Sequence, residues 1–361
     1  MVGISRRQAL GVPLLMATTA QAAETPTELV GGTATSPDGR IIAFAYAVPS
    51  AKGRTRRLTG IGLLDRATGQ LQRVPNPGGR QLGYPCFDSA GGRLACLSGA
   101  TGSSVWKGVA IVDLATLRAT EVVVPASASS DHPIERVDTA IFQPGSGRLL
   151  IARSARYPER VEFLLLDPAT TRHQVVLPEA RSLARVASTA FLSADEIIFA
   201  GVGRMAGRLL QEVQAIGLRE TQIVLFRLRF GEEPQVLMPA LEAQRQRPGA
   251  GDAFSGTAVS RSGLMLSLTR HDVVGPPPEY GMQVVRIEPG PQRLELLTAT
   301  PGRKAYPSIA FDGGVAAFMA TADGDANRNN WDLWTLDLRT GRSNNERVLA
   351  RIVADRRFLL P

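Results

Sequence analysis

Short apolar runs alternate with tight polar turns along nearly the whole chain, and the alternation repeats. One unit begins with "TATSPDGRIIAFAYAV" (residues 33–48) and continues with "GIGLLDRATGQLQRV" (residues 60–74). A last unit runs from "YPSIAFDGGVAAFMATA" (residues 306–322) to "WDLWTLDLRTGRSNNERVL" (residues 331–349). Each unit predicts a strand, a tight turn, an apolar strand, a variable loop, an apolar strand, a polar turn and a final strand. Six such units fill the chain.

The length of these units predicts the fold class. Units of about 40–50 residues with four strands are typical of a β-propeller. One four-stranded sheet cannot bury both of its faces alone, so the sheets stack as blades of a ring. We therefore predict an all-β, six-bladed β-propeller of four-stranded antiparallel blades. In the fourth blade, Leu209, Val213 and Ile216 recur at helical spacing before Gly217 and predict a short helical insertion.

The turns carry their own chemistry. In Ser36-Pro37-Asp38-Gly39, proline presets φ at the first corner and glycine accepts the left-handed position that closes the hairpin. With this "SPDGRIIAF" box, the "YP" pairs at Tyr84 and Tyr306 and the "LDxxTG" turns, the chain resembles the TolB-like six-bladed β-propeller family (WD40-like PD40 repeat). The box is weaker in units four and five, as "SADE" and "SRSG".

This resemblance covers nearly all of the chain after the first residues. About ten residues separate the expected signal from the first blade, so we expect the propeller without the TolB N-terminal domain. The resemblance implies a broad range of functions: binding of proteins or peptides, accessory modules of peptidases, and a few enzymes.

The first residues predict export. Arg6 and Arg7 precede a short apolar stretch and an Ala20-Gln21-Ala22 site. This pattern is typical of a cleavable signal peptide, which is too short to remain as a membrane span. The paired arginines resemble a Tat signal, and ordinary Sec export is the alternative. We assign residues 1–22 to the signal and 23–361 to a single propeller domain in the periplasm or secreted medium, with no transmembrane segment.

Charge adds little to this picture. The formal charge of +8 falls to +6 without Arg6 and Arg7, and the basic residues are spread along the chain. "KGRTRR" (residues 52–57) is the only tight basic cluster. We interpret the charge as solvation or attraction to anionic envelope surfaces, and expect no nucleic-acid partner.

Binding is expected on the face that carries the irregular loops. The SPDG-type and LDxxTG-type turns share one face because every strand reverses direction, and the variable loops occupy the opposite face. Loops on a rigid scaffold commonly carry binding residues. The candidate ligand-binding residues there are cationic, aromatic or titratable: Arg54, Arg56, Arg57, Trp106, Lys107, Asp131, His132, Arg156, Tyr157, His271 and Tyr280. Each aromatic or cationic residue could instead cover its own hairpin, and each histidine could be a solvated loop residue.

The stretch "TADGDANRNNWDLW" raises the question of calcium. Asp323, Asp325 and Asn327 alternate as hard oxygen ligands would, with Asp332 as a possible fourth. However, Arg328 stands where an EF-type loop needs glycine, and hairpin tips favour the same residue types. We interpret the stretch as a hairpin and expect no metal or other cofactor.

Cys86 and Cys96 are the only cysteines. Both lie in the hairpin "CFDSAGGRLAC", and a turn centred near residue 91 would place them opposite each other. Export favours oxidation of such a pair. We predict a Cys86–Cys96 disulfide; the alternative is two buried thiols in a register shifted by one residue.

Two functions remain open. The leading hypothesis is a monomeric, non-enzymatic module that binds an envelope protein, peptide or glycan through the irregular face. The alternative is an exported lyase or hydrolase with a metal at the ring centre. The sequence has no G-x-S-x-G motif of serine hydrolases, and the residues best placed to line the axis are mostly Thr, Ala, Tyr and Pro. We therefore favour binding.

Overall fold

The protein is known from a computed structural model. It describes residues 27–50, 53–103, 105–126, 136–155, 160–180, 183, 185–202, 223–237, 254–260, 265–270, 282–287, 294–298, 304–321 and 331–358. Within these ranges the strands form six antiparallel sheets, each of four strands consecutive in the chain. The helical insertion expected near residues 203–220 lies outside the described residues.

Each sheet is a blade, numbered here in chain order. Blades 1 and 2 contain β1 (Glu28–Thr35), β2 (Ile41–Ser50), β3 (Gly53–Asp65), β4 (Leu71–Val74), β5 (Arg80–Phe87), β6 (Arg93–Ala100), β7 (Gly108–Asp113) and β8 (Arg118–Val122), with the short 3-10 helix η1 (Pro77–Gly79) between them. Blades 3 and 4 contain β9 (Arg136–Phe142), β10 (Leu149–Ala155), β11 (Arg160–Leu166), β12 (His173–Ala180), β13 (Arg185–Ser193), β14 (Glu196–Val202), β15 (Ile223–Arg229) and β16 (Gln235–Val236). Blades 5 and 6 contain β17 (Phe254–Val259), β18 (Met265–Arg270), β19 (Met282–Ile287), β20 (Leu294–Leu296), β21 (Lys304–Ile309), β22 (Val315–Thr321), β23 (Trp331–Asp337) and β24 (Ser343–Asn345), followed by α4 (Val348–Ala354) and the 3-10 helix η2 (Arg356–Phe358).

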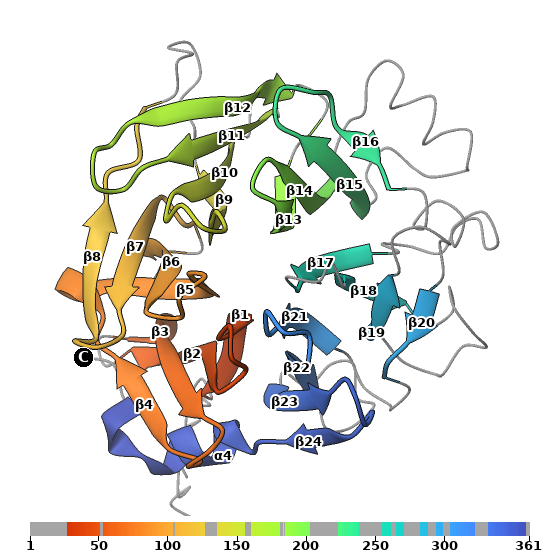
Figure 1. The fold of residues 1–361 in the computed structure, drawn as a ribbon. Helices are drawn as coiled ribbons and strands as arrows, with labels where there is room; N and C mark the ends of the chain where they lie inside the picture. The colour runs from red at the N-terminus through yellow and green to blue at the C-terminus, as the bar shows by residue number, and fades with distance from the viewer. Residues whose placement is uncertain are drawn as a thin grey trace, which may run out of the picture.

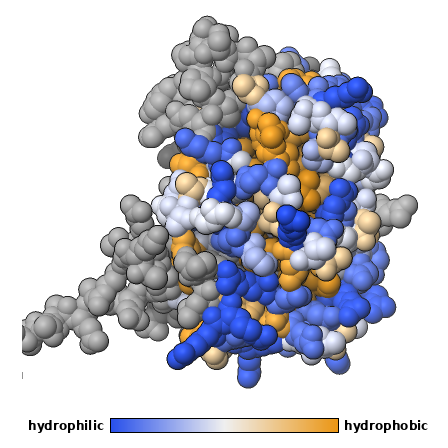
Figure 2. Space-filling view, turned by 90° about the vertical axis from the view of Figure 1, so that its left-hand side faces the viewer, coloured by the Kyte–Doolittle hydropathy of each residue, from blue (hydrophilic) through white to orange (hydrophobic). Residues whose placement is uncertain are grey.

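The blades surround a central axis (Figure 1). The first strand of each blade is innermost, and β1 of the first blade lies beside β21 of the last. The prediction of an all-β propeller with four-stranded antiparallel blades is therefore confirmed. On the side that carries β8, hydrophobic residues form a narrow band between hydrophilic surfaces (Figure 2). No helix in the described ranges has the length and apolar character needed to span a membrane.

The tight turns follow the sequence chemistry. In blade 1 the Ser36 N–H donates to the Ile41 carbonyl at 2.8 Å, which leaves four residues in the turn. Gly39 takes the left-handed conformation there, with φ of 70°. The Asp38 carboxylate accepts the Ser36 hydroxyl and the Arg40 N–H, and the first of these bonds holds the pKa of Asp38 below its usual value. Local side-chain bonds of this type stabilise the turn through residues of the turn itself.

The first and third turns of a blade share one face, as predicted. The Arg66 N–H donates to the Arg40 carbonyl at 2.9 Å, joining the two turns of blade 1. The Arg40 guanidinium also contacts the Asp65 carboxylate at 2.7 Å. We call this face of the ring the turn end, and the opposite face, where the second and third strands connect, the loop end.

The predicted disulfide requires a correction, because Cys86 and Cys96 are free thiols. The Asp88 carboxylate accepts the N–H groups of Gly92 and Arg93, and this turn holds four residues. The resulting register places Cys86 opposite Ala95. Neighbours on a strand face opposite sides of the sheet, so Cys96 packs in the core between blades 1 and 2. Burial raises the pKa of Cys86 to about 11.

The C-terminal segment covers the seam between the last and first blades. Val348 and Ile352 of α4 and Phe358 of η2 are buried with apolar residues of both blades. The Phe358 ring meets Tyr46 of blade 1 edge-on, with centroids 5.5 Å apart. Since every sheet uses four consecutive strands, this segment joins the two blades by side-chain packing rather than by a shared strand.

Candidate functional site

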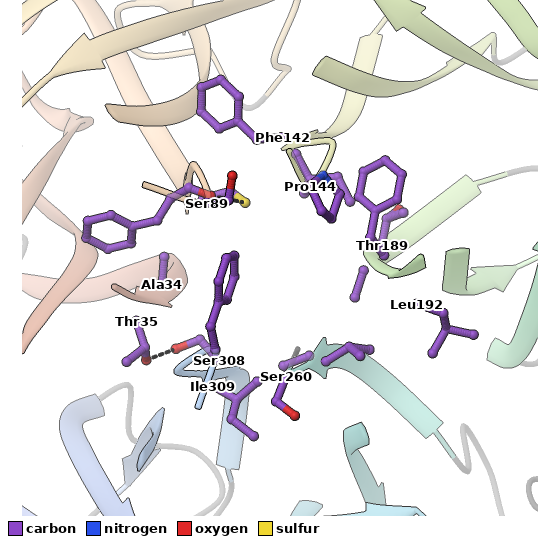
Figure 3. Close-up of a pocket in the computed structure, with 18 of the residues that line it drawn as sticks. Ala34, Thr35, Ser89, Phe142, Pro144, Thr189, Leu192, Ser260, Ser308 and Ile309 are labelled. Atoms are coloured by element: carbon purple, nitrogen blue, oxygen red, sulfur yellow. Dashed lines mark hydrogen bonds between the residues drawn. The ribbon is translucent and has the colours of Figure 1, made fainter. Parts of the chain in front are cut away.

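A cavity of about 690 Å³ lies on the ring axis toward the turn end. All six innermost strands line it with the last residues before their first turns (Figure 3). The labelled Ala34, Phe142, Thr189 and Ile309 come from four different blades. The volume lies within the range of about 300–1,000 Å³ that is typical of ligand pockets.

The described lining of this cavity is uncharged. It comprises threonines and serines with aliphatic, aromatic, proline, glycine and cysteine residues: Thr33, Ala34, Thr35, Pro85, Cys86, Phe87, Ser89, Ile141, Phe142, Pro144, Gly145, Thr189, Ala190, Phe191, Leu192, Ser193, Ala258, Val259, Ser260, Pro307, Ser308, Ile309 and Phe311. No Asp, Glu, His, Lys or Arg is among them. Among the described residues, the lining therefore provides no carboxylate, imidazole or amine for acid–base chemistry.

Several of the hydroxyl groups are already used within the protein. Thr33 Oγ1 donates to Ser308 Oγ at 3.1 Å, and Thr35 Oγ1 bonds the same Ser308 Oγ at 2.8 Å. Thr189 Oγ1 lies 3.0 Å from Thr139 Oγ1 of the neighbouring blade. These bonds tie blades 1 to 6 and 3 to 4. What remains for a ligand is a mixed surface, with somewhat more apolar than polar area.

A tyrosine layer lies next to the cavity, on its loop-end side. Tyr84 and Tyr306 immediately precede the cavity-lining Pro85 and Pro307, and their rings meet edge-on at 5.9 Å. Both tyrosines have left-handed φ angles of 51° and 52°. A following proline disfavours helical conformations, so this backbone is strained, and such strain is concentrated at functional sites. Opposite them in blade 1 is Gly32, at φ of 110°. A Cβ there would lie 3.1 Å from the Tyr84 Cα.

At the loop end, the first residues of the innermost strands are mostly charged. They are Glu28, Arg80, Arg136, Arg185 and Lys304 in five of the six blades, and Phe254 in blade 5. Arg136 Nε contacts the Asp138 carboxylate at 2.7 Å, and Arg80 Nε contacts Glu121 at 3.4 Å. Burial raises the pKa of Asp138 and lowers the pKa of Lys304 to about 8.

Two predicted binding residues, Trp106 and Lys107, can be placed. The Trp106 ring meets Tyr84 edge-on at 6.0 Å and covers Gly83 of its own blade. Its carbonyl accepts the Val137 N–H of blade 3 at 2.8 Å. Trp106 therefore supports the tyrosine layer, while Lys107 is exposed at the loop end.

The remaining candidates are mostly outside the described residues. Arg54, Arg56 and Arg57 were expected among the irregular loops, but they lie on β3, which begins at Gly53. The irregular pairing of Pro49 with Arg57 and Ser50 with Gly53 leaves residues 54–56 unpaired in that register. Outside the described residues are Asp131, His132, Arg156, Tyr157, His271, Tyr280, Asp323, Asp325 and Asn327.

Asp332, the fourth calcium candidate, has a structural role. Its Oδ1 accepts the N–H of Leu349 at 3.1 Å and that of Leu333 at 2.9 Å. Leu349 lies in the first turn of α4, whose cap residue Arg347 provides no side-chain bond. A carboxylate at this position satisfies a free helix N–H and complements the helix dipole. Within the described ranges, no three His, Cys, Asp or Glu residues gather as a metal site would require.

The sequence pointed to the wrong end of the axis for the described cavity. The irregular loops favoured the loop end, whereas this cavity is formed by regular strands just before their shortest turns. The sequence signal for it is positional: the three residues before each first turn, read together across six units, are small, hydroxylated, aliphatic or aromatic, and none of them is charged.

Comparison with known proteins supports the fold and no more. No family model matches the sequence, and no curated protein matches it. Among solved structures, a putative TolB from Agrobacterium tumefaciens is similar with a TM-score of 0.55 and 13% identity, over 80% of this chain and 87% of that one. The β-propeller domain of the Trilobed protease from Pyrococcus furiosus has a TM-score of 0.54 and 10% identity, over 89% and 98%. An oligogalacturonate lyase in complex with manganese has a TM-score of 0.50 and 12% identity, over 88% and 77%. The chain thus has a β-propeller fold similar to TolB-like propellers.

Proposed function

We propose that this protein is an exported, six-bladed binding module that takes an uncharged, mainly apolar segment of a partner polypeptide into its axial cavity. The carrying observation is that the described residues of the cavity lining are uncharged and come from all six blades. Apolar surface removed from water provides about 25 cal/mol per Å², so such a lining favours apolar side chains.

The same lining favours a peptide over a glycan. A buried sugar hydroxyl without a partner costs about 1–3 kcal/mol. The Thr33, Thr35, Thr189 and Ser308 hydroxyls already bond one another or Thr139. A sugar would leave several of its hydroxyls poorly paired, whereas leucine, proline or phenylalanine side chains would not.

A neutral fluorescent probe, N-phenyl-1-naphthylamine, tests the cavity directly. Leu192 lines the cavity (Figure 3) and is only partly buried, so Leu192→Asp adds a charge with little expected damage to the fold. We expect the probe to bind the wild-type chain and to bind Leu192→Asp at least tenfold more weakly. The matched control is Val123→Asp, because Val123 is 70% exposed and lies outside the cavity.

Competition then identifies the ligand class. A capped peptide, acetyl-Leu-Phe-Pro-amide, should displace the probe, and maltotetraose should not. Equal probe affinity in wild type and Leu192→Asp would rule out the cavity as the binding site, and displacement by maltotetraose would overturn the peptide assignment.

A further inference from the structure

The helix α4 has an outward face without a polar side chain. Its inward residues Val348 and Ile352 are buried in the seam between blades 6 and 1. Ala350, Val353 and Ala354 follow the spacing of one helix face and are exposed, and Val353 is 64% exposed. A surface helix of a globular protein normally presents polar residues to water. This helix instead leaves a small apolar face at the outer edge of the ring, beside β4 (Figure 1).

The one polar side chain of the helix is directed toward the ring. Arg351 is the only polar or charged residue in the helix sequence "VLARIVA". Its guanidinium donates to the carbonyl of Gly69, in the turn before β4 of blade 1. This hydrogen bond holds Arg351 against blade 1. The outward face therefore gains no polar group from within the helix.

Arginines flank this apolar face at both ends of the helix. Arg347 precedes the helix, and Arg356 and Arg357 follow it in η2; all three are exposed. Arg357 contacts Asp355 at 2.6 Å. Among the described residues, Arg347 and Arg356 have no carboxylate within ion-pair distance. Two guanidinium groups, one at each end of the helix, are therefore available to an anionic partner.

The surroundings of the helix do not reverse this charge. Residues 346–358 contain four arginines and two carboxylates, a net charge of 4 − 2 = +2. Two charged residues of the adjoining blades bond to the backbone of this segment. Arg73 of blade 1 donates to the Arg357 carbonyl at 3.3 Å, and Asp332 of blade 6 accepts the Leu349 N–H at 3.1 Å. These two add one charge of each sign, so the described segment remains basic.

We propose that the outward face of α4 and its flanking arginines form a contact site for a membrane surface rich in anionic lipid. We call this site the α4 patch; it comprises Arg347, Ala350, Val353, Ala354, Arg356 and Arg357. Exposed arginines attract an anionic lipid surface. The apolar face enters the headgroup layer between them, as the apolar faces of interfacial helices do.

The size and charge of the α4 patch favour lipid over a protein partner. A stable protein interface needs about 800 Å² on each side and commonly uses aromatic anchors. The outward face of α4 consists of one valine and two alanines. A second copy docked face to face would place arginine against arginine. The patch lies away from the axial cavity, so this proposal goes beyond the proposed function and does not depend on it.

Vesicle sedimentation tests the α4 patch on the protein purified from the producing cell. Vesicles of phosphatidylglycerol and phosphatidylcholine in equal parts should bind the wild type more tightly than vesicles of phosphatidylcholine alone. Arg347→Gln combined with Arg356→Gln should weaken binding to the anionic vesicles by about 10–30-fold, because each arginine near such a surface contributes roughly a factor of five. Val353→Asp should weaken it by about tenfold or more. Since all three residues are exposed, the thermal melts of both variants should match that of the wild type.

The controls make the same changes elsewhere on the surface. Arg118→Gln combined with Arg172→Gln removes two exposed arginines from blades 2 and 3, and Val123→Asp changes a valine that is 70% exposed. Both controls should bind anionic vesicles as the wild type does. Equal vesicle binding by wild type and the α4-patch variants, or an equal loss in the controls, would overturn the proposal. Wild type that binds immobilised poly-glutamate but not the vesicles would assign the patch to an acidic protein instead.

Discussion

The two ends of the ring axis are built from the same six strands and yet differ in chemistry. At the turn end, residues such as Thr33, Thr189 and Ser308 present hydroxyl and apolar groups, and their hydroxyls bond between blades. At the loop end, the same strands begin with Arg136, Arg185 and other charged residues. The uncharged residues at the turn end and the charged residues at the loop end are thus only one strand length apart.

This difference reflects how the backbone is stabilised at each end of the axis. At the turn end, the first turns of blades 1 and 2 are closed by their own Asp, Ser or Gly, so cavity side chains are not needed to hold these turns and can be neutral. At the loop end, the long connections begin, and charged pairs such as Arg153–Glu162 hold the strands together. Charge at the loop end is therefore partly structural.

The first prediction concerns how much a buried ion pair at the loop end contributes to the free energy of unfolding. Arg153 and Glu162 face each other on β10 and β11 at 2.7 Å, with 3% and 6% of their side chains exposed. Arg153→Met should lower the free energy of unfolding by about 3–5 kcal/mol, because it leaves a buried carboxylate unpaired. Urea denaturation followed by circular dichroism measures this change.

The double variant Arg153→Met with Glu162→Leu is the control. It removes both charges and should be more stable than the single variant, since a buried ion pair is often replaceable by apolar residues. A loss below about 1 kcal/mol in the single variant would mean that this pair contributes no more than a surface pair does.

The second prediction concerns Lys304, which begins β21 at the loop end. Burial lowers its pKa from 10.5 to about 8 in the folded protein. Between these values the unfolded chain binds more protons than the folded one, so the free energy of unfolding rises with pH. Relative to Lys304→Met, wild type should gain about 1–2 kcal/mol between pH 8 and pH 10.

The comparison with Lys304→Met removes the contribution of other groups, including Tyr46, whose pKa burial raises. Parallel pH dependences of the two proteins in urea denaturation would contradict a lowered pKa at Lys304. The turn-end carboxylates, such as Asp65 with its lowered pKa, titrate in acid and do not affect this window.

Most of the fold could be predicted because its information is local. Asp38, Asp88 and Gly39 act within their own turns, and the spacing of strands and turns recurs in six units, so strand order and the shared face of the turns followed from that spacing. The predicted pairing of Cys86 with Cys96 was wrong because register, too, is set by local bonds. The length of that turn is set by bonds of the Asp88 side chain, and one residue of difference turns Cys96 to the other face.

The candidate sites were harder to predict because they assemble across the ring. The cavity takes three to five described residues from each blade, and Thr33 contacts Ser308 from a position 275 residues away. Trp106 looked like a loop-tip contact residue, but its ring contacts Tyr84, which no pattern in its own loop indicates. Arg136 and Asp138 lie two residues apart on β9, but only the arrangement of blades shows that Asp138 also accepts the Val186 N–H of blade 4.

The smallest expected effect on stability comes from replacing Asp332 at the loop end. This replacement tests whether Asp332 is a helix-capping carboxylate or a metal ligand. Asp332 Oδ1 accepts the Leu349 N–H in the first turn of α4, the helix that covers the seam between blades 6 and 1. Replacing a capping carboxylate typically costs about 0.5–2 kcal/mol. Asp332→Ala should therefore lower the unfolding free energy by about 1 kcal/mol, and Asp332→Asn should recover part of it because its amide oxygen still accepts.

Measurements with and without calcium distinguish two possible roles of Asp332, helix cap and calcium ligand. A cap acts without metal, so the loss in Asp332→Ala should be equal in EDTA and in 5 mM calcium (roughly a saturating excess for the known classes of calcium site). If Asp332 ligated calcium, wild type would be stabilised by about 2.7 kcal/mol at a hundredfold excess of metal over Kd. The variant would then lose most of this stabilisation, and the two proteins would differ far more with calcium than without it. Thermal melts of both proteins in the two buffers measure this, and coincident wild-type melts would assign Asp332 to the helix cap alone.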